Sequence, residues 1–88
     1  MKELKVSTKI ANNGTAKISA STGKSIFVTA VTSADSSAAT VTFADDSDLG
    51  ILEIPAASTL NLTIPIRCAS FTPSNAAISV VYYEEAKI

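Results

Sequence analysis

The amino-acid sequence predicts an all-β protein, a single small β-sandwich or barrel of seven or eight short strands. Two stretches carry the prediction. Leu60, Leu62, Ile64 and Ile66 alternate with polar residues or proline, a period of two that places one set of side chains in a core. A second apolar run, residues 78–83, follows a turn that contains Pro and Asn. No stretch of comparable length has the spacing of an amphipathic helix.

The N-terminal quarter contributes two expected strands. Residues 4–10 form the first, with Ile10 on its apolar face. The Asn-Asn-Gly turn at 12–14 follows, because Asn-Gly readily adopts the positive φ angles of tight hairpins. Alternation resumes over residues 16–21 and ends at the Thr-Gly-Lys turn, residues 22–24.

Residues 25–32 are almost continuously apolar, which indicates a strand buried on both faces or one whose second face meets another subunit. The remaining expected strands are 38–43, 50–54, 59–66 and 77–84, with residues 67–71 as a short edge strand. The expected core comprises Leu60, Leu62, Ile64, Ile66, Ile78 and Val80, together with Phe27, Phe43 and Phe71. Turns recur about every ten residues, a spacing typical of sandwiches and barrels. Jelly-roll and Ig-like connectivity both stay open.

The chain of 88 residues corresponds to one domain, residues 1–88, of marginal stability on its own. Small folds of this size usually add a disulfide, a metal or a partner subunit. Cys68 is the only cysteine and the chain has no histidine, so neither an internal disulfide nor a Cys/His zinc site can form. We therefore expect a homo-oligomer, and the alternative is a monomer held by a well-packed sandwich.

The charge balance argues against nucleic acid as a partner. Seven Lys and Arg against eight Asp and Glu give a net charge of −1, and a domain that binds phosphates usually carries a basic face. Three of the first five residues are charged and no apolar segment of a signal peptide follows them, and no run approaches eighteen apolar residues. We therefore expect neither a signal peptide nor a membrane span.

Catalytic equipment is sparse in this sequence. Without histidine, Cys68 has no imidazole to activate it and no Ser-His-Asp triad can form. The acidic loop at 45–48, with Glu53 downstream, is the densest carboxylate cluster, but its Gly and Glu offsets differ from those of a calcium loop. We expect no enzyme activity, no cofactor and no metal. A solvated hairpin tip is the expected role of the loop.

Four residues are candidates for a protein interface: Lys5, Lys9, Phe27 and Tyr83. The two lysines lie on the polar face of the first expected strand. Because Tyr82 and Tyr83 are adjacent, a strand directs one into the core and the other outward, where tyrosine is a common contact residue.

The order of segments over residues 25–84 resembles that of a family of viral proteins. The apolar strand at 25–32 is followed by Ala-Thr-Val-Thr-Phe at 39–43, Gly-Ile-Leu-Glu-Ile-Pro at 50–55 and Leu-Asn-Leu-Thr-Ile-Pro-Ile at 60–66. The run Ile-Ser-Val-Val-Tyr-Tyr-Glu closes the pattern. It is similar to small β-sandwich structural proteins of tailed bacteriophages, which occur as capsid decoration (cement) proteins, head fibres and tail-associated modules.

The resemblance implies a structural virion protein rather than an enzyme. It favours a capsid decoration protein, a homotrimer that binds the major capsid protein or other virion proteins at the capsid surface after synthesis in the host cytoplasm. The alternative is a tail or head-fibre module that binds a host receptor or carbohydrate. Residues 1–10, which include Lys5 and Lys9, are then a candidate docking arm that adds a strand to the shell.

Overall fold

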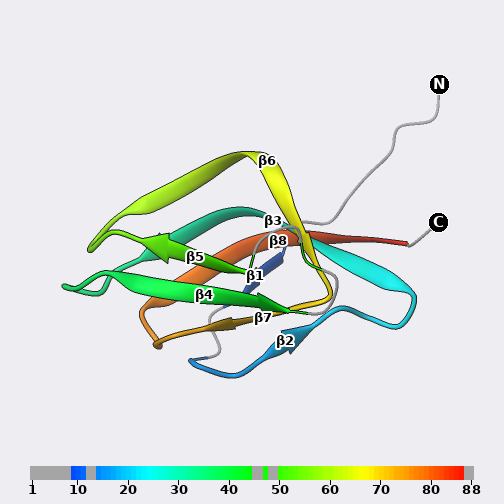
Figure 1. Cartoon of the computed structure of the whole chain (residues 1–88), viewed down its shortest axis with the longest axis horizontal. Helices are drawn as coiled ribbons and strands as arrows, with labels where there is room; N and C mark the ends of the chain where they lie inside the picture. The colour runs from blue at the N-terminus through cyan, green and yellow to red at the C-terminus, as the bar shows by residue number, and fades with distance from the viewer. Residues whose placement is uncertain (1–8, 12–13, 45–46, 48–49, 87–88) are drawn as a thin grey trace.

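A computed structural model of the chain describes residues 9–11, 14–44, 47 and 50–86, which contain eight strands and no helix (Figure 1). None of these residues therefore belongs to a helix able to cross a membrane. The strands are β1 (Lys9–Ala11), β2 (Ile18–Ser19), β3 (Lys24–Ser33), β4 (Ala39–Ala44), β5 (Ile51–Ile54), β6 (Thr59–Cys68), β7 (Ser70–Pro73) and β8 (Ile78–Ala86). The predicted all-β class is confirmed.

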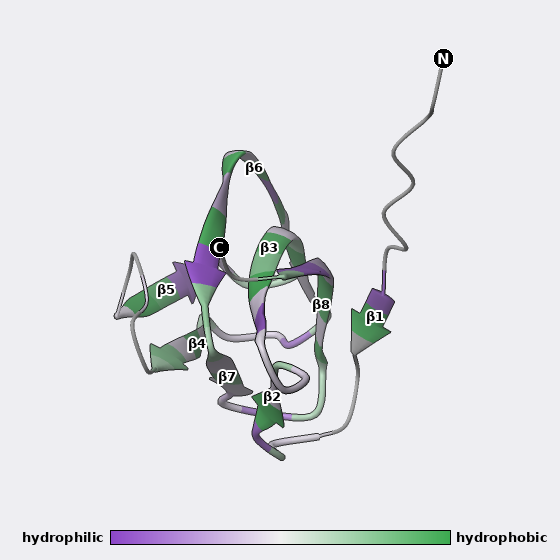
Figure 2. Cartoon of the chain, turned by 90° about the vertical axis from the view of Figure 1, so that its right-hand side faces the viewer, coloured by the Kyte–Doolittle hydropathy of each residue, from purple (hydrophilic) through white to green (hydrophobic). Residues whose placement is uncertain are grey.

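The strands form two antiparallel sheets of four. Sheet A has the order β1-β8-β3-β6 and sheet B has the order β2-β7-β4-β5. The pairs β1/β8, β2/β7, β3/β6 and β4/β5 are nested, as in a long hairpin that has been folded over on itself. This order is that of a jelly roll, which decides the connectivity that the sequence left open. Figure 2 shows the two sheets as two layers, with β5 and β6 along one side of the sandwich and β1 and β2 along the other.

The core lies between the sheets and is built by alternate residues of each strand. On β8 the side chains of Ile78, Val80 and Tyr82 are buried and their neighbours are only partly so. The predicted burial of Ile66, Ile78, Val80, Phe43 and Phe71 is confirmed. Leu60 and Leu62 are partly buried and pack against the core.

Ile64 is the clear exception to the predicted core, because its side chain is 81% exposed. The β3–β6 ladder pairs residues 59–61 and 66–68 of β6, but residues 62–65 have no partner in β3, where only Thr29 lies between the two halves. The excess of three residues on the β6 side makes β6 arch away from the sandwich (Figure 1). Proline at position 65 suits such an edge strand, since it has no N–H to donate. We call residues 62–65 the β6 crest.

Thr29 is a β-bulge residue that shifts the register of β3 against both of its neighbours. Its hydroxyl donates a hydrogen bond to the carbonyl oxygen of Val81 at 3.2 Å, which keeps β3 and β8 tied at the bulge. Because the bulge inverts the alternation, Val28 and Val31 both face the core although they are three residues apart.

The boundaries predicted around residues 67–71 were wrong. The edge strand expected at 67–71 does not exist as such, because Arg67 and Cys68 complete β6. After Ala69 the chain enters sheet B as β7, an interior strand between β2 and β4. Periodicity continues across Ala69, so the change of sheet left no mark in the pattern.

Three loops meet at one end of the sandwich, around Asp35. The Asp35 carboxylate accepts hydrogen bonds from the side-chain amide of Asn75 at 3.0 Å and from the Ser36 N–H at 2.9 Å. Its backbone carbonyl accepts one from the N–H of Ala57 at 2.9 Å. The β3–β4, β5–β6 and β7–β8 connections are therefore fixed to one another, which leaves this end polar and closed.

Candidate interface on the outer face of sheet A

The outer faces of the two sheets differ in chemistry. Sheet B presents mainly hydroxyls and a carboxylate to the outside, at Ser19, Thr40, Thr42, Glu53 and Thr72, with the exposed Ile51 opposite Thr42 on its edge strand β5. Sheet A presents apolar and aromatic side chains across the middle of β1, β8 and β3, and its outward residues nearer the margins, such as Thr32, Ser79 and Asn61, are polar. An antiparallel sheet that faces water normally carries polar residues on its outer face, as sheet B does. Sheet A departs from this rule.

The apolar part of sheet A is a patch of five side chains, which we call the outer patch: Ile10, Phe27, Ala30, Val81 and Tyr83. The register places them in two adjacent rows. Ile10 is opposite Val81, and Val81 is opposite Ala30, so one row crosses β1, β8 and β3. Tyr83 is opposite Phe27 in the next row. Ile10 is 73% exposed and the other four are partly buried.

Phe27 and Tyr83 form the aromatic centre of the outer patch. Their rings are stacked with centroids 5.2 Å apart and planes inclined by 11°. Tyr82 points the opposite way, into the core, where its ring meets Phe71 edge-on at 5.4 Å. The prediction that the two tyrosines face opposite sides is confirmed. The prediction of a core position for Phe27 was wrong, because the strand parity directs it outward against Tyr83.

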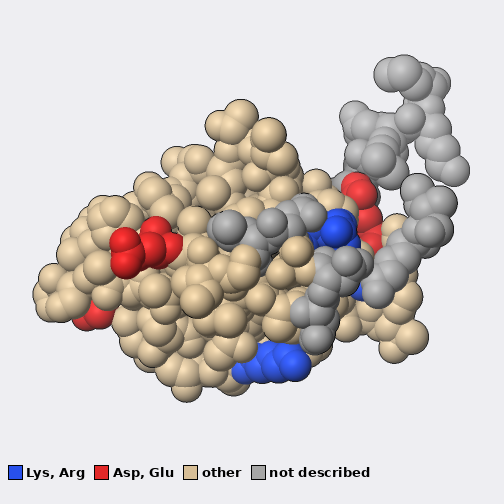
Figure 3. All heavy atoms as spheres, in the orientation of Figure 1, with Lys and Arg blue, Asp and Glu red and all other residues tan. Residues whose placement is uncertain are grey.

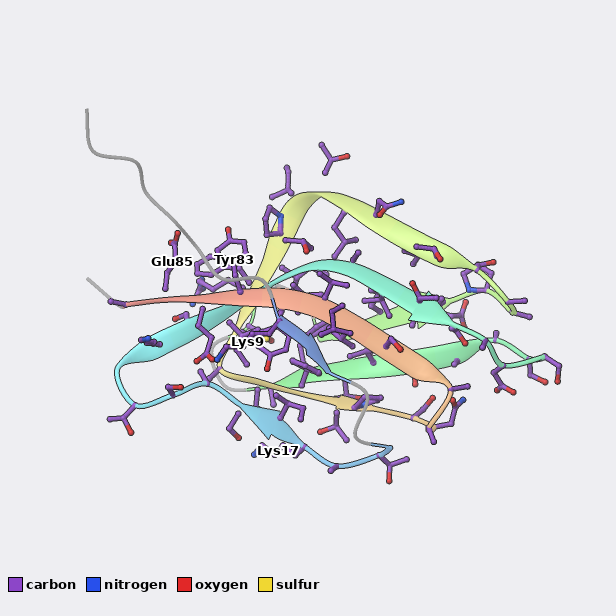
Figure 4. The ribbon with its side chains drawn as sticks, turned by 180° about the vertical axis from the view of Figure 1, so that it is seen from behind. Lys9, Lys17, Tyr83 and Glu85 are labelled. Atoms are coloured by element: carbon purple, nitrogen blue, oxygen red, sulfur yellow. The ribbon has the colours of Figure 1, made fainter. Side chains whose placement is uncertain are left out.

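The two rows end at polar residues on β6. Arg67 is the register partner of Phe27, and Asn61 is the partner of Ala30. On β8, Glu85 follows Tyr83 on the same outer face and is exposed. The outer patch therefore lies between a cation on β6 and an anion at the end of β8. Figure 4 shows Tyr83 and Glu85 together on one side of β8.

Lys9 lies on the other side of β8, facing inward at the end of the core (Figure 4). Its ammonium donates to Glu84 Oε2 at 2.7 Å, and the backbone N–H of Ser21 donates to Glu84 Oε1, also at 2.7 Å. The Glu84 side chain is only 7% exposed, whereas that of Lys9 is 50% exposed. One carboxylate therefore ties β1 and the β2–β3 turn to β8.

These contacts shift the pKa values of both Glu84 and Lys9. The hydrogen bond from Lys9, followed by that from the Ser21 N–H, lowers the pKa of Glu84 below its ordinary value. The same bond raises the pKa of Lys9. Both groups are held in their charged forms, as expected of an ion pair with a nearly buried carboxylate.

The predicted faces of the first strand were therefore wrong within the described part of the chain. Lys9 was expected on an outward polar face and Ile10 on the apolar core face, but the arrangement is the reverse. The register is the reason, because Lys9 is opposite the inward-facing Tyr82 and its ammonium reaches Glu84, two residues further along the same face of β8. Lys5 and the rest of the expected strand before Lys9 lie outside the described residues.

Among the residues that the structure describes, three large apolar side chains are strongly exposed, and each belongs to an edge strand. They are Ile10 on β1, Ile51 on β5 at 61% exposure and Ile64 on the β6 crest. Ile10 adjoins the outer patch. Ile51 and Ile64 lie on the opposite side of the sandwich, where β5 and β6 run along the margins of the two sheets (Figure 2).

The other candidate groups in the described residues offer no reactive arrangement. Cys68 is buried in the core at 1% exposure. Within that part of the chain, no three His, Cys, Asp or Glu residues converge as a metal site would require. The acidic loop at 45–48 lies largely outside it. Charged side chains form separate spots on the face seen in Figure 3, rather than a continuous basic or acidic surface.

Sequence reasoning found Phe27 and Tyr83 but missed the rest of the outer patch. A signal was present: residues 80–83 are apolar or aromatic at every position, whereas a strand with one wet face alternates. Ile51 and Ile64 left no such signal, because in the sequence they look like ordinary core positions. Comparison with protein-family models, curated proteins and solved structures finds no match to this chain.

Proposed function

We propose that this chain is a structural virion protein of a tailed phage, a capsid decoration protein that stabilises the shell through protein–protein interfaces and acts as a homotrimer. The observation that carries the proposal is the apolar outer face of sheet A. A jelly roll needs only its inner faces to fold, so five apolar or aromatic side chains on an outer face point to contact with another protein.

The remaining features of the described residues agree with a binding role. The jelly roll occurs in viral capsid proteins, although it also serves other functions and supports the proposal only by analogy. The resemblance in segment order to phage structural proteins is independent of the surface chemistry. Stabilisation would arise by linkage, because a protein that binds the assembled shell and not its separated subunits favours the assembled state.

The proposal is tested on particles of the phage that encodes the chain, prepared with and without this protein. Particles that lack it should assemble but release DNA at a lower temperature, and added purified protein should restore resistance in a saturable way. Val81→Asp places a charge in the outer patch and should abolish restoration. Thr42→Asp, on the outer face of sheet B, is the matched control and should restore fully.

Two results would contradict the proposal. Particles that are equally resistant with and without the protein would remove its shell-stabilising role. If particles that lack the protein are stable but fail to adsorb to cells, the chain is a fibre or tail module. A truncated protein that begins at Lys9 tests the docking role proposed for residues 1–10 while it keeps the Lys9–Glu84 ion pair and Ile10, so it should remain folded but lose particle binding.

A further inference from the structure

β1 is attached to the sandwich by few contacts. It has three residues and pairs with β8 along one edge only. Lys9 and Ile10 are both exposed, and neither belongs to the hydrophobic core or packs against it. The short ladder and the ion pair between Lys9 and Glu84 are therefore the main attachments of β1 within the described part of the chain. A strand held in this way opens at a lower free energy than strands whose side chains fill a core.

We propose that the carboxylate of Glu84 is a pH-sensitive latch for β1: its ionised form holds the strand on sheet A, and its protonated form releases the strand while the two sheets stay folded. The latch does not rest on the proposed function, but its consequence does. Residues 1–10 are the candidate docking arm, so the latch determines whether that arm is held on its own sheet or is free to bind elsewhere.

The surroundings of Glu84 make its charge important. The side chain stands on the inner face of β8, opposite the fully buried Ile26 of β3, and it is only 7% exposed. Each carboxylate oxygen has its own donor at 2.7 Å, the Lys9 ammonium at Oε2 and the Ser21 backbone N–H at Oε1. A carboxylate that water hardly reaches depends on such donors to stay ionised. Protonation removes the ion pair, because a neutral carboxyl group attracts an ammonium far less.

The two donors differ in what else holds them. Ser21 belongs to a turn that keeps other hydrogen bonds when the carboxyl group is neutral. The Lys24 N–H donates to the Ser21 carbonyl oxygen at 2.9 Å, and the Ala20 N–H donates to that of Ala69 at 2.8 Å. Ala20 also packs against the core. The described residues give Lys9 no such support, and its half-exposed side chain can exchange the lost partner for water. Protonation therefore loosens β1 and leaves the β2–β3 turn in place.

The charged groups around Glu84 give the direction of the switch. Among the described residues, Lys9 is the cation on the β1 side, and Lys24 is exposed at the start of β3. On β8, Tyr82 is the neighbour on the same face and Glu85 lies on the opposite face. The hydrogen bonds from Lys9 and the Ser21 N–H hold the pKa of Glu84 below its ordinary 4.5. The latch is therefore closed at neutral pH and opens as the pH falls through that lowered value.

Trypsin reports the state of β1, because Lys9 lies within the strand and cleavage after it requires the strand to open. The full chain is digested at neutral pH, and mass spectrometry follows the fragment that begins at Ile10. This fragment should accumulate with Arg67 of β6 still uncut. Glu84→Gln, the neutral isostere of the protonated latch, should accelerate its appearance about tenfold, as expected when a hydrogen bond to a charged group is lost. Glu85→Gln, at an exposed carboxylate on the outer face, is the matched control and should be cleaved at the wild-type rate.

Hydrogen exchange of the wild-type chain tests the protonation step. The protection of the amides of residues 9–11 should fall about tenfold as the pH falls below 4.5, and Glu84→Gln should lack this step. At each pH this protection should be lower than that of the β3 amides.

Three results would overturn the inference. They are a Glu84→Gln chain cleaved after Lys9 no faster than the wild type, cleavage after Arg67 as early as after Lys9, and equal protection of the β1 and β3 amides. The first would show that the carboxylate does not hold β1, and the other two that β1 opens only when the whole chain unfolds. Particle binding is measured separately. A latch that opens as predicted, on a chain whose residues 1–10 are not needed for particle binding, would refute the docking role alone.

Discussion

Val80 and Val81 provide a matched pair for testing the architecture, because they are the same residue type at adjacent positions of β8. Val80 is fully buried between the sheets, whereas Val81 lies in the outer patch and is partly exposed. Replacing valine by alanine removes two methylene equivalents. At about 0.8 kcal/mol for each buried CH₂, the transfer contribution at Val80 is about 1.6 kcal/mol.

The cavity left at Val80 increases this cost. With about 24 cal/mol for each Å³ that does not collapse, the total loss for Val80→Ala is about 2–3 kcal/mol. Val81→Ala should cost less than about 1 kcal/mol in the monomer, because no second layer covers it within the described chain. A domain of this size has roughly 4–13 kcal/mol of stability, so the first loss is a large share of the total.

Urea unfolding followed by far-ultraviolet circular dichroism measures both losses, at a protein concentration low enough to keep the chain monomeric. For a slope of about 1 kcal/mol per M, Val80→Ala should lower the midpoint by about 2–3 M and Val81→Ala by less than about 1 M. Equal losses, or a larger loss at Val81, would show that the assignment of inner and outer faces on β8 is wrong.

Three further predictions follow from local contacts. Because the pKa of Glu84 is lowered from its ordinary 4.5, its ionised form stabilises the fold above that pH, and this stabilisation is lost as the pH falls through the lower folded value. In urea melts below about pH 4.5, the free energy of unfolding should therefore fall less steeply with pH for Glu84→Gln than for the wild type. Lys9→Met should make the same decline smaller. A double-mutant cycle with Phe27→Ala and Tyr83→Ala should give a coupling of about 0.5–1.5 kcal/mol, the usual value of an aromatic pair, and a coupling near zero would contradict the stack. Ala57 has a φ of 49°, so Ala57→Gly should raise the thermal midpoint through a gain of about 0.5 kcal/mol, where glycine ordinarily destabilises.

The positions of most strands could be predicted from the sequence because alternation is a local property. Residues 25–32 and 77–84 contain most of β3 and β8, and residues 38–43 contain most of β4. The order of strands within the sheets could not be predicted in this way. Pairing of β1 with β8, or of β3 with β6, joins segments far apart in the chain, and period-two patterns say nothing about which strands become neighbours.

The errors at Ile64 and Lys9 have a common physical cause. Alternation assigns a side chain to a face of its strand, but it does not tell whether the core still lies beneath that face. At Ile64 the strand has arched away from the sandwich, and at Lys9 the inward face of the edge strand β1 meets the Glu84 carboxylate rather than apolar side chains. Both sites are on edge strands, where the tertiary contacts that override a local pattern are hardest to foresee.

The candidate interface was partly visible in the sequence, because local alternation indicates which side chains leave the core. Phe27 lies in a run too apolar for a strand with one wet face, and Tyr83 adjoins a tyrosine that must face the other way. Their contact with each other could not be foreseen, since it depends on the register between β3 and β8. The contribution of Ile10 depends in turn on the register of β1 with β8.

The central claim is that the apolar outer face of sheet A is an interface between proteins, the first of them a second copy of this chain. Native mass spectrometry of the full-length protein over about 1–20 µM tests this most directly. The account predicts a trimer, at three times the 9.1 kDa chain mass, which Val81→Asp dissociates and Thr42→Asp leaves intact. A folded monomer of 9.1 kDa throughout this range, or a trimer that Val81→Asp leaves unchanged, would contradict it.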